Sequence, residues 1–218
     1  MRVGLNLVFL VPGETGGMEV YARELLPRLA ALGRFELTAF VAREAAGLDL
    51  GVPVRVLPVN ARNRVEWVRG EQQHLPRAVD RAGCAVLHSL ASTAPVWGRA
   101  TRVTTIHDLN YKLVPDTHFG VRGLGMRLLV PAAARRSRRV IAISESTRRD
   151  LVAHLRVPED RIDVVPQGVA PPSAAATPGR ELRERTCAWF AANARRLSLE
   201  SSLAQVAAAY AGWDRARS

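Results

Sequence analysis

The stretch PGETGGMEVYARELL, residues 12–26, joins a glycine-containing loop to the start of an amphipathic helix. An apolar run of strand length precedes it, so we expect a strand, a loop and a helix in that order. Gly16 and Gly17 would allow backbone N–H groups to approach a ligand, and a helix N-terminus favours an anion. A tight strand-to-helix turn without a ligand explains the same residues. Together with Gly13 they do not form G-x-G-x-x-G, so a nicotinamide cofactor is disfavoured.

Two other expected strands run into histidine. His107 and Asp108 end the apolar run in TTIHDLNY, and His88 ends the run in VLHSL. A histidine at a strand end can hydrogen-bond a hydroxyl or phosphate oxygen, or transfer a proton. The alternative is a structural histidine with local hydrogen bonds. Two such ends at one edge of a sheet favour a shared polar cleft, with His88 and Asp108 on its rim.

A third candidate lies in RVIAISESTRRDL, where a strand runs into Ser144. Ser144 or Ser146 could cap the helix that follows, and Glu145 would then lie beside the cleft with Ser144. Capping alone also explains the serines. The cysteines at 84 and 187 are far apart and form no C-x-x-C pair, so we expect no metal site.

These residues need a scaffold, and the sequence predicts one. Apolar runs of strand length alternate with helical patterns, which argues for an α/β fold. We expect a Rossmann-like three-layer parallel sheet of about seven strands with helices on both faces. The expected strands are Val3–Leu10, Glu36–Val41, Val54–Val59, Ala85–His88, Arg102–His107, Val140–Ser144 and Ile162–Val165. The expected helices are Met18–Leu32, Asn63–Arg81, Val121–Arg136 and Thr147–Leu155. Pro27 argues against an unbroken first helix, and we expect the third to be broken or kinked near Pro131.

The composition limits the partners. The chain has 218 residues, 48% of them hydrophobic, and a formal net charge of +11. Lys112 is its only lysine, and the arginines are mostly scattered, so we do not expect nucleic-acid binding. The first apolar run is too short for a signal peptide or membrane span, which predicts a cytoplasmic protein. The basic stretch 121–139 fits either contact with anionic lipid or a sheet-packing helix with a solvated end.

The alternation of strands and helices ends in the C-terminal part of the chain. IDVVPQGV, residues 162–169, begins as a strand and is followed by a Pro/Ala-rich stretch. We expect a sheet domain over 1–169, a linker over 170–179 and a helical segment over 180–218. That segment predicts helices over Arg180–Arg196 and Leu199–Trp213. The second has an apolar stripe that must dock on the sheet domain or on another chain.

Taken together, these segments resemble the amino-terminal half of the family 4 glycosyltransferases, which have the two-domain GT-B fold. The matching stretches are GGMEVYARELLPRLA (16–30), TTIHDL (104–109), VIAISESTRRDL (140–151) and PEDRIDVVPQGV (158–169). The resemblance implies sugar transfer from a nucleotide-sugar to an acceptor, with retention of configuration and without a metal or other cofactor. It places Gly16 and Gly17 beside the diphosphate and the reacting sugar. Glu19 would orient this loop, and His107, the catalytic candidate, would contact the donor sugar.

The resemblance also exposes a gap. The family's second half carries a glutamate pair separated by seven residues that holds the nucleotide-sugar, and residues 180–218 contain no such pair. The stretch from Ala192 to Trp213 instead resembles the family's last helices. We therefore expect an acceptor domain, a single GT-B half, joined to C-terminal helices without the donor domain, and inactive or acceptor-binding only. A non-catalytic binding module and a membrane-surface acceptor domain stay open as alternatives, and the oligomeric state stays undetermined.

Overall fold

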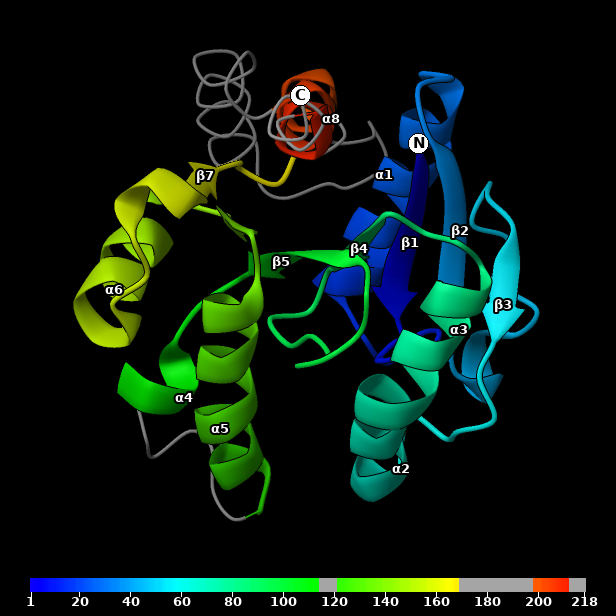
Figure 1. Cartoon of the computed structure of the whole chain (residues 1–218), viewed down its shortest axis with the longest axis horizontal. Helices are drawn as coiled ribbons and strands as arrows, with labels where there is room; N and C mark the ends of the chain where they lie inside the picture. The colour runs from blue at the N-terminus through cyan, green and yellow to red at the C-terminus, as the bar shows by residue number, and fades with distance from the viewer. Residues whose placement is uncertain (114–120, 169–197, 212–218) are drawn as a thin grey trace, which may run out of the picture. The chain divides into compact units, whose positions relative to one another are not determined.

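The computed structural model describes residues 1–113, 121–168 and 198–211. The chain divides into two compact units, Met1–Val164 and Val165–Ser218. The first unit contains the sheet and the candidate site, and the second contains one described helix (Figure 1). The linker predicted over 170–179 and the helix predicted over 180–196 lie outside the described residues.

One parallel sheet of seven strands organises the described part of the first unit. Its strand order is β3-β2-β1-β4-β5-β6-β7, and every neighbouring pair is parallel. The strands are β1 (Arg2–Leu7), β2 (Glu36–Val41), β3 (Val54–Val56), β4 (Val86–Ser89), β5 (Thr101–Ile106), β6 (Arg139–Ala142) and β7 (Ile162–Val164). The predicted Rossmann-like parallel sheet is confirmed.

Helices cover both faces of this sheet. Strand order reverses beside β1, and right-handed crossovers then put helices before and after the reversal on opposite faces. Figure 1 shows α1 (Gly17–Ala31) behind β1 and α3 (Leu75–Arg81) in front of the sheet. The other α-helices described in this unit are α2 (Arg64–Arg69), α4 (Asn110–Leu113), α5 (Val121–Arg136) and α6 (Glu145–Leu155). On the α3 face, Leu75 and Val79 join a buried cluster with Phe40 and Leu87.

The helix predicted over Asn63–Arg81 is divided into three. Asn63 caps α2, since its side chain accepts hydrogen bonds from two backbone N–H groups. A π-helical turn, η2 (Gly70–His74), follows, and α3 begins at Leu75 with a proline in its first turn. Gly70 packs closely, because a Cβ there would lie 2.7 Å from Val59 Cγ2. Close packing of this turn therefore depends on the missing side chain.

Both internal prolines are accommodated. Helix α1 continues through Pro27, whose exposed side leaves the lost hydrogen bond facing water, and α5 continues through Pro131. Helix α1 is therefore unbroken at Pro27, and α5 is not broken at Pro131. The strand predicted over Val3–Leu10 ends at Leu7, because the Leu10 N–H turns back to bond Leu7 O at 3.0 Å.

The second unit contains α8 (Leu199–Ala211), which confirms most of the last predicted helix. Val206 and Tyr210 of this helix are fully buried, as the predicted apolar stripe requires. The Ser202 hydroxyl donates to the backbone oxygen of Pro166 and ties the helix to the segment that follows β7. Docking of this helix on the sheet domain stays a prediction.

Deletion of residues 197–218 tests that docking. We expect the melting temperature to fall by about 6–24 °C, because the deletion removes the burial of Val206 and Tyr210, worth about 1.5–3 kcal/mol each. A shorter deletion of 212–218, which leaves α8 intact, is the control and should change melting little. Equal melting of the full chain and the longer deletion would show that α8 contributes no stabilising contact.

Candidate ligand site at the carboxyl edge of the sheet

The reversal of strand order between β1 and β4 marks the candidate site. In open parallel sheets, ligands bind outside the carboxyl ends of the strands where the order reverses. The loops that follow β1 and β4, residues 8–16 and 90–100, flank this point. His107 and Asp108 follow the next strand, β5. The topology therefore brings three of the predicted segments to one edge.

The loop after β1 is shaped by its own hydrogen bonds. The Thr15 hydroxyl accepts from the Val11 N–H at 2.8 Å and donates to Val11 O at 2.7 Å. Gly16 stands before α1 with φ 60° and ψ −134°, and no side chain caps the helix. A Cβ on Gly16 or Gly17 would meet no described atom within 4 Å. The loop thus presents exposed backbone at a helix N-terminus, a geometry that suits an anion.

Glu19 holds this loop against the helix. Its Oε2 accepts the Gly13 N–H at 2.7 Å, and its Oε1 accepts from the Arg23 guanidinium at 2.8 and 2.9 Å. Arg23 and the Gly13 N–H hold the pKa of the Glu19 carboxyl below its ordinary value, so the carboxylate is ionised at neutral pH. Because its side chain is nearly buried, Glu19 orients the loop rather than offering its charge to solvent.

The backbone conformation of Gly16 should make this position sensitive to substitution, whereas the neighbouring Gly17 should not be. Its φ of 60° with ψ −134° is a conformation that side chains disfavour, so Gly16→Ala should destabilise the chain by about 1–3 kcal/mol. Gly17→Ala, inside the first turn of α1 and equally open, should be neutral or slightly stabilising. Urea unfolding of both variants measures this difference. Equal effects of the two substitutions would contradict a backbone origin.

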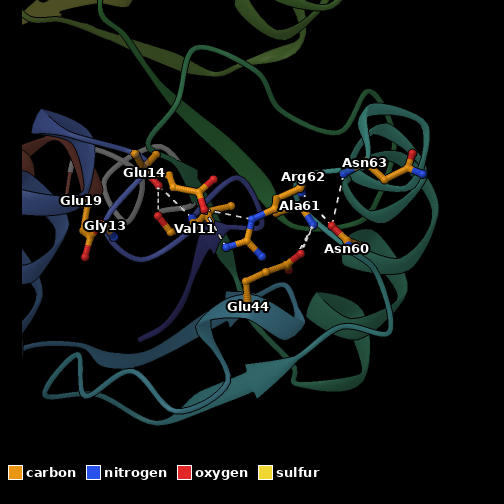
Figure 2. A network of polar contacts seen from close by, with 10 residues as sticks. Val11, Gly13, Glu14, Glu19, Glu44, Asn60, Ala61, Arg62 and Asn63 are labelled. Carbon is orange, nitrogen blue, oxygen red and sulfur yellow. Dashed lines mark hydrogen bonds and ion pairs between the residues drawn. The ribbon is translucent and has the colours of Figure 1, made fainter.

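Two further loops join the loop after β1 at this edge, as Figure 2 shows. The Arg62 guanidinium, in the loop after β3, forms an ion pair with Glu14 at 2.7 Å. Glu44, from the turn after β2, accepts the Ala61 N–H at 3.1 Å. These contacts join residues far apart in the sequence, and no local pattern there singled them out. Both partners of the Glu14–Arg62 pair are half-exposed, so its contribution to stability is small.

His107 is held by three contacts. The ring Nε2 lies 2.6 Å from Leu90 O. The backbone N–H of His107 donates to Ser92 Oγ at 3.2 Å, and its backbone oxygen accepts from Thr147 Oγ1 at 3.0 Å. Burial lowers the pKa of His107, against the effect of its bond to Leu90, so the ring is neutral at pH 7. A neutral ring facing a carbonyl oxygen must carry its proton on Nε2. The loop after β4 therefore determines both the position and the tautomer of His107.

His88 does not lie on an exposed rim. It sits one residue before the end of β4 and is fully buried, with its Nε2 2.8 Å from Thr105 Oγ1. Burial lowers its pKa to about 3, so this imidazole is neutral. The sequence-based placement at the cleft rim is corrected, because β4 is a central strand covered on both faces.

The remaining predicted residues have local partners. Asp108 is exposed and accepts the Asn110 N–H at 2.9 Å, which starts α4. Ser144 caps α6 by accepting the Thr147 N–H at 3.1 Å, and Glu145 pairs with Arg148 at 2.7 Å. Because Thr147 also bonds His107 O, the structure brings Ser144 close to the His107 segment.

One buried polar cluster was not predicted from the sequence. Asn6, Glu71 and Thr93 meet between the ends of β1 and β4, joined by hydrogen bonds of 2.8 Å. The available signal was a single polar residue inside the apolar run VGLNLVFL. Among the described residues, no group of three or more metal-binding side chains could hold a metal, and no described helix is long and apolar enough to cross a membrane.

The fold defines a doubly wound α/β protein, with the candidate site at the point of strand-order reversal. The model for Glycosyltransferase Family 4 matches residues 15–171, most of the chain. The protein belongs to this family. No curated protein sequence matches it.

Solved structures share the fold. A sucrose-phosphate synthase (tll1590) from Thermosynechococcus elongatus has a TM-score of 0.59 at 14% identity, covering 78% of this chain and 48% of that one. Anabaena Alr3699/HepE in complex with UDP and glucose has a TM-score of 0.50 at 15% identity, covering 86% and 50%. A UDP-N-acetylglucosamine 2-epimerase from Rickettsia bellii has a TM-score of 0.53 at 12% sequence identity, covering 77% of this chain and 45% of that one.

The chain thus spans about half the length of these three structures. A second structure of the Thermosynechococcus protein, described as tll1590_27_220_406_426, is matched over 98% of its length, with a TM-score of 0.50 at 12% identity and 88% of this chain covered. Since a sucrose-phosphate synthase and an epimerase are both similar at low identity, these structures show the fold and not the reaction.

Proposed function

We propose that this chain is the acceptor-side half of a retaining glycosyltransferase that uses a nucleotide-sugar. The observation that carries the proposal is the family match over residues 15–171, in a chain that covers 48% of the Thermosynechococcus sucrose-phosphate synthase. The HepE structure contains UDP and glucose, which supports a nucleotide-sugar as the donor class. Alone, the chain is inactive or binds acceptor only, and it works in the cytoplasm.

Within this proposal the predicted residues have defined roles. The exposed N–H groups at Gly16 and Gly17, at the start of α1, would face the donor diphosphate. His107, neutral and held through Leu90 O, would contact the donor sugar. Stabilising a departing nucleoside diphosphate requires preorganised donors on both sides of the bond that breaks. One half of the enzyme supplies one of those sides.

The same proposal covers the C-terminal part. We take the numbers 27_220_406_426 to denote two joined stretches, an N-terminal one and a short later one. The order proposed here is the same: a sheet domain, a linker over 170–179, and a helical segment over 180–218 that packs back on the sheet domain. The buried residues of α8, Val206 and Tyr210, support a packing role for that segment.

Site-resolved NMR tests the proposed ligand class. Titration of the labelled chain with UDP or inorganic phosphate should shift the backbone amides of residues 13–19, because the N–H groups at Gly16 and Gly17, at the start of α1, would face the added anion. The amide of His107 should shift with UDP, because its ring would lie beside the ligand. Uridine, which lacks phosphate, is the control and should leave the amides of residues 13–19 unchanged. Phosphate-dependent shifts confined to other parts of the chain, or equal shifts with uridine, would contradict the proposal.

A further inference from the structure

A buried carboxylate lies between the two halves of the candidate site. Glu71, in the π-helical turn η2, is 2% exposed. Its Oε1 accepts from Asn6 Nδ2 and from the Thr93 hydroxyl, each at 2.8 Å, and its Oε2 accepts from Gln72 Nε2 at 3.3 Å. Burial raises the pKa of Glu71, and the bonds from Asn6, Thr93 and Gln72 oppose that rise. A buried carboxyl with several donors is a costly arrangement that needs an explanation.

One side of the cluster leads to the loop after β1. Asn6 is at the end of β1, and its Oδ1 accepts the N–H of Val8, the first residue of that loop, at 3.2 Å. Its Nδ2 also donates to Ser89 Oγ in β4 at 3.0 Å. Glu71 therefore fixes the rotamer of the residue from which the loop containing Gly16 and Gly17 departs.

The other side leads to His107. Thr93, bonded to Glu71, follows Ser92, which has a left-handed φ of 61°. Ser92 donates its N–H to Thr105 O at 2.9 Å and accepts the His107 N–H through Oγ. A non-glycine residue in this conformation persists only where its surroundings hold it. Glu71 and Ser92 thus act on the same short loop that orients the His107 ring.

The π-helical turn brings Glu71 to this place. Gly70 packs so closely that a Cβ would lie 2.7 Å from Val59 and 3.2 Å from Val8. Gln72, which follows Glu71 in the turn, donates to Ala94 O at 3.0 Å and accepts the Val96 N–H at 3.1 Å. The turn is therefore bound to the loops after both β1 and β4, and π-helical turns recur at functional sites.

We propose that Glu71 is a positioning residue that sets the loop after β1 and the His107 loop relative to each other across the point of strand-order reversal. This inference rests on the proposed function only for its consequence in ligand binding. The geometry of the two loops in the free protein can be measured without any ligand.

The central experiment exchanges donor and acceptor across the Asn6–Glu71 pair. In Glu71→Gln, one acceptor oxygen becomes an NH2 group that faces a donor in either orientation, Gln72 Nε2 or the Asn6 and Thr93 side chains. The hydrogen bonds around residue 71 must therefore rearrange, and the amide signals of Val8, Ser92 and His107 should shift in the ligand-free chain. The double variant Asn6→Asp/Glu71→Gln restores a donor facing an acceptor, since the Ser89 and Thr93 hydroxyls can donate or accept. It should return these signals toward their wild-type positions.

Two variants separate positioning from general core damage. Thr93→Val removes one hydroxyl of the cluster and should shift Ser92 and His107 while leaving Val8 unchanged. Thr104→Val is the control, because this buried hydroxyl bonds Ser137 Oγ at 2.7 Å and not the cluster. It should leave Val8 and Ser92 unshifted. These two variants keep the test available if Glu71→Gln does not fold.

Ligand titration then completes the test. UDP-induced shifts at Gly16, Gly17 and His107 should be lost in Glu71→Gln and recovered in the double variant. Unchanged loop signals in Glu71→Gln and Thr93→Val, or a double variant as perturbed as Glu71→Gln, would overturn the role of Glu71. Displaced loops together with no UDP response in the wild-type chain would support the positioning role and contradict the proposed function instead.

Discussion

The purified 218-residue chain is expected to show no sugar transfer at a rate near that of a complete family member. Holding the donor in position can supply about 7–11 kcal/mol of barrier reduction, and donor positioning needs contacts from both sides of the diphosphate. The described site offers two exposed glycines, Gly16 and Gly17, at the uncapped start of α1, and a neutral His107. These contacts support weak binding of phosphate or a nucleoside diphosphate at most.

Calorimetric titration with several nucleotide-sugars, paired with a donor-consumption assay, measures this. A complete two-domain member of the family, assayed in parallel, shows that the assay detects transfer. His107→Ala in this chain should then change neither result measurably. Micromolar donor affinity with steady turnover by the isolated chain would show that the proposal of a missing donor half is wrong.

The second large effect concerns acid stability and His88. Its pKa of about 3 in the folded protein lies below the ordinary 6.5, so the unfolded chain binds the proton more readily between these values. Stability contributed by the neutral His88 is therefore complete above pH 6.5 and is lost as the pH falls toward 3. From these two values, the free energy of unfolding should drop by about 2 kcal/mol between pH 7 and pH 5 through His88 alone.

Urea unfolding at pH 7 and pH 5 tests this sign and size. His88→Gln has no titrating ring, so its loss of stability between the two pH values should be smaller than the wild-type loss by about 2 kcal/mol. His154→Gln, at an exposed position, is the matched control and should keep the wild-type loss. Titration of the His88 ring signal near pH 6 in the folded chain would contradict the burial argument directly.

The success and failure of the sequence-based predictions follow from the range of the interactions involved. The central strands were predictable because they are short, buried apolar runs, a pattern present within a few residues. The cap at Ser144 was predictable for the same reason, since its partner Thr147 is three residues away. The division of the helix predicted over Asn63–Arg81 could not be predicted, because its π-helical turn depends on packing of Gly70 against Val59, which lies outside that stretch of the sequence.

By itself, the sequence determined the α/β class, the parallel sheet, the family, and the segments that meet at the carboxyl edge. Strand periodicity and strand-to-helix order are local properties, and the topology of parallel sheets brings such ends together. Only the tertiary structure decided that His88 is buried beneath that edge while His107 stays at it. It also joined Asn6, Glu71 and Thr93. Burial and partners separated by 65 or 22 residues arise only when the chain packs, so no local pattern encodes them.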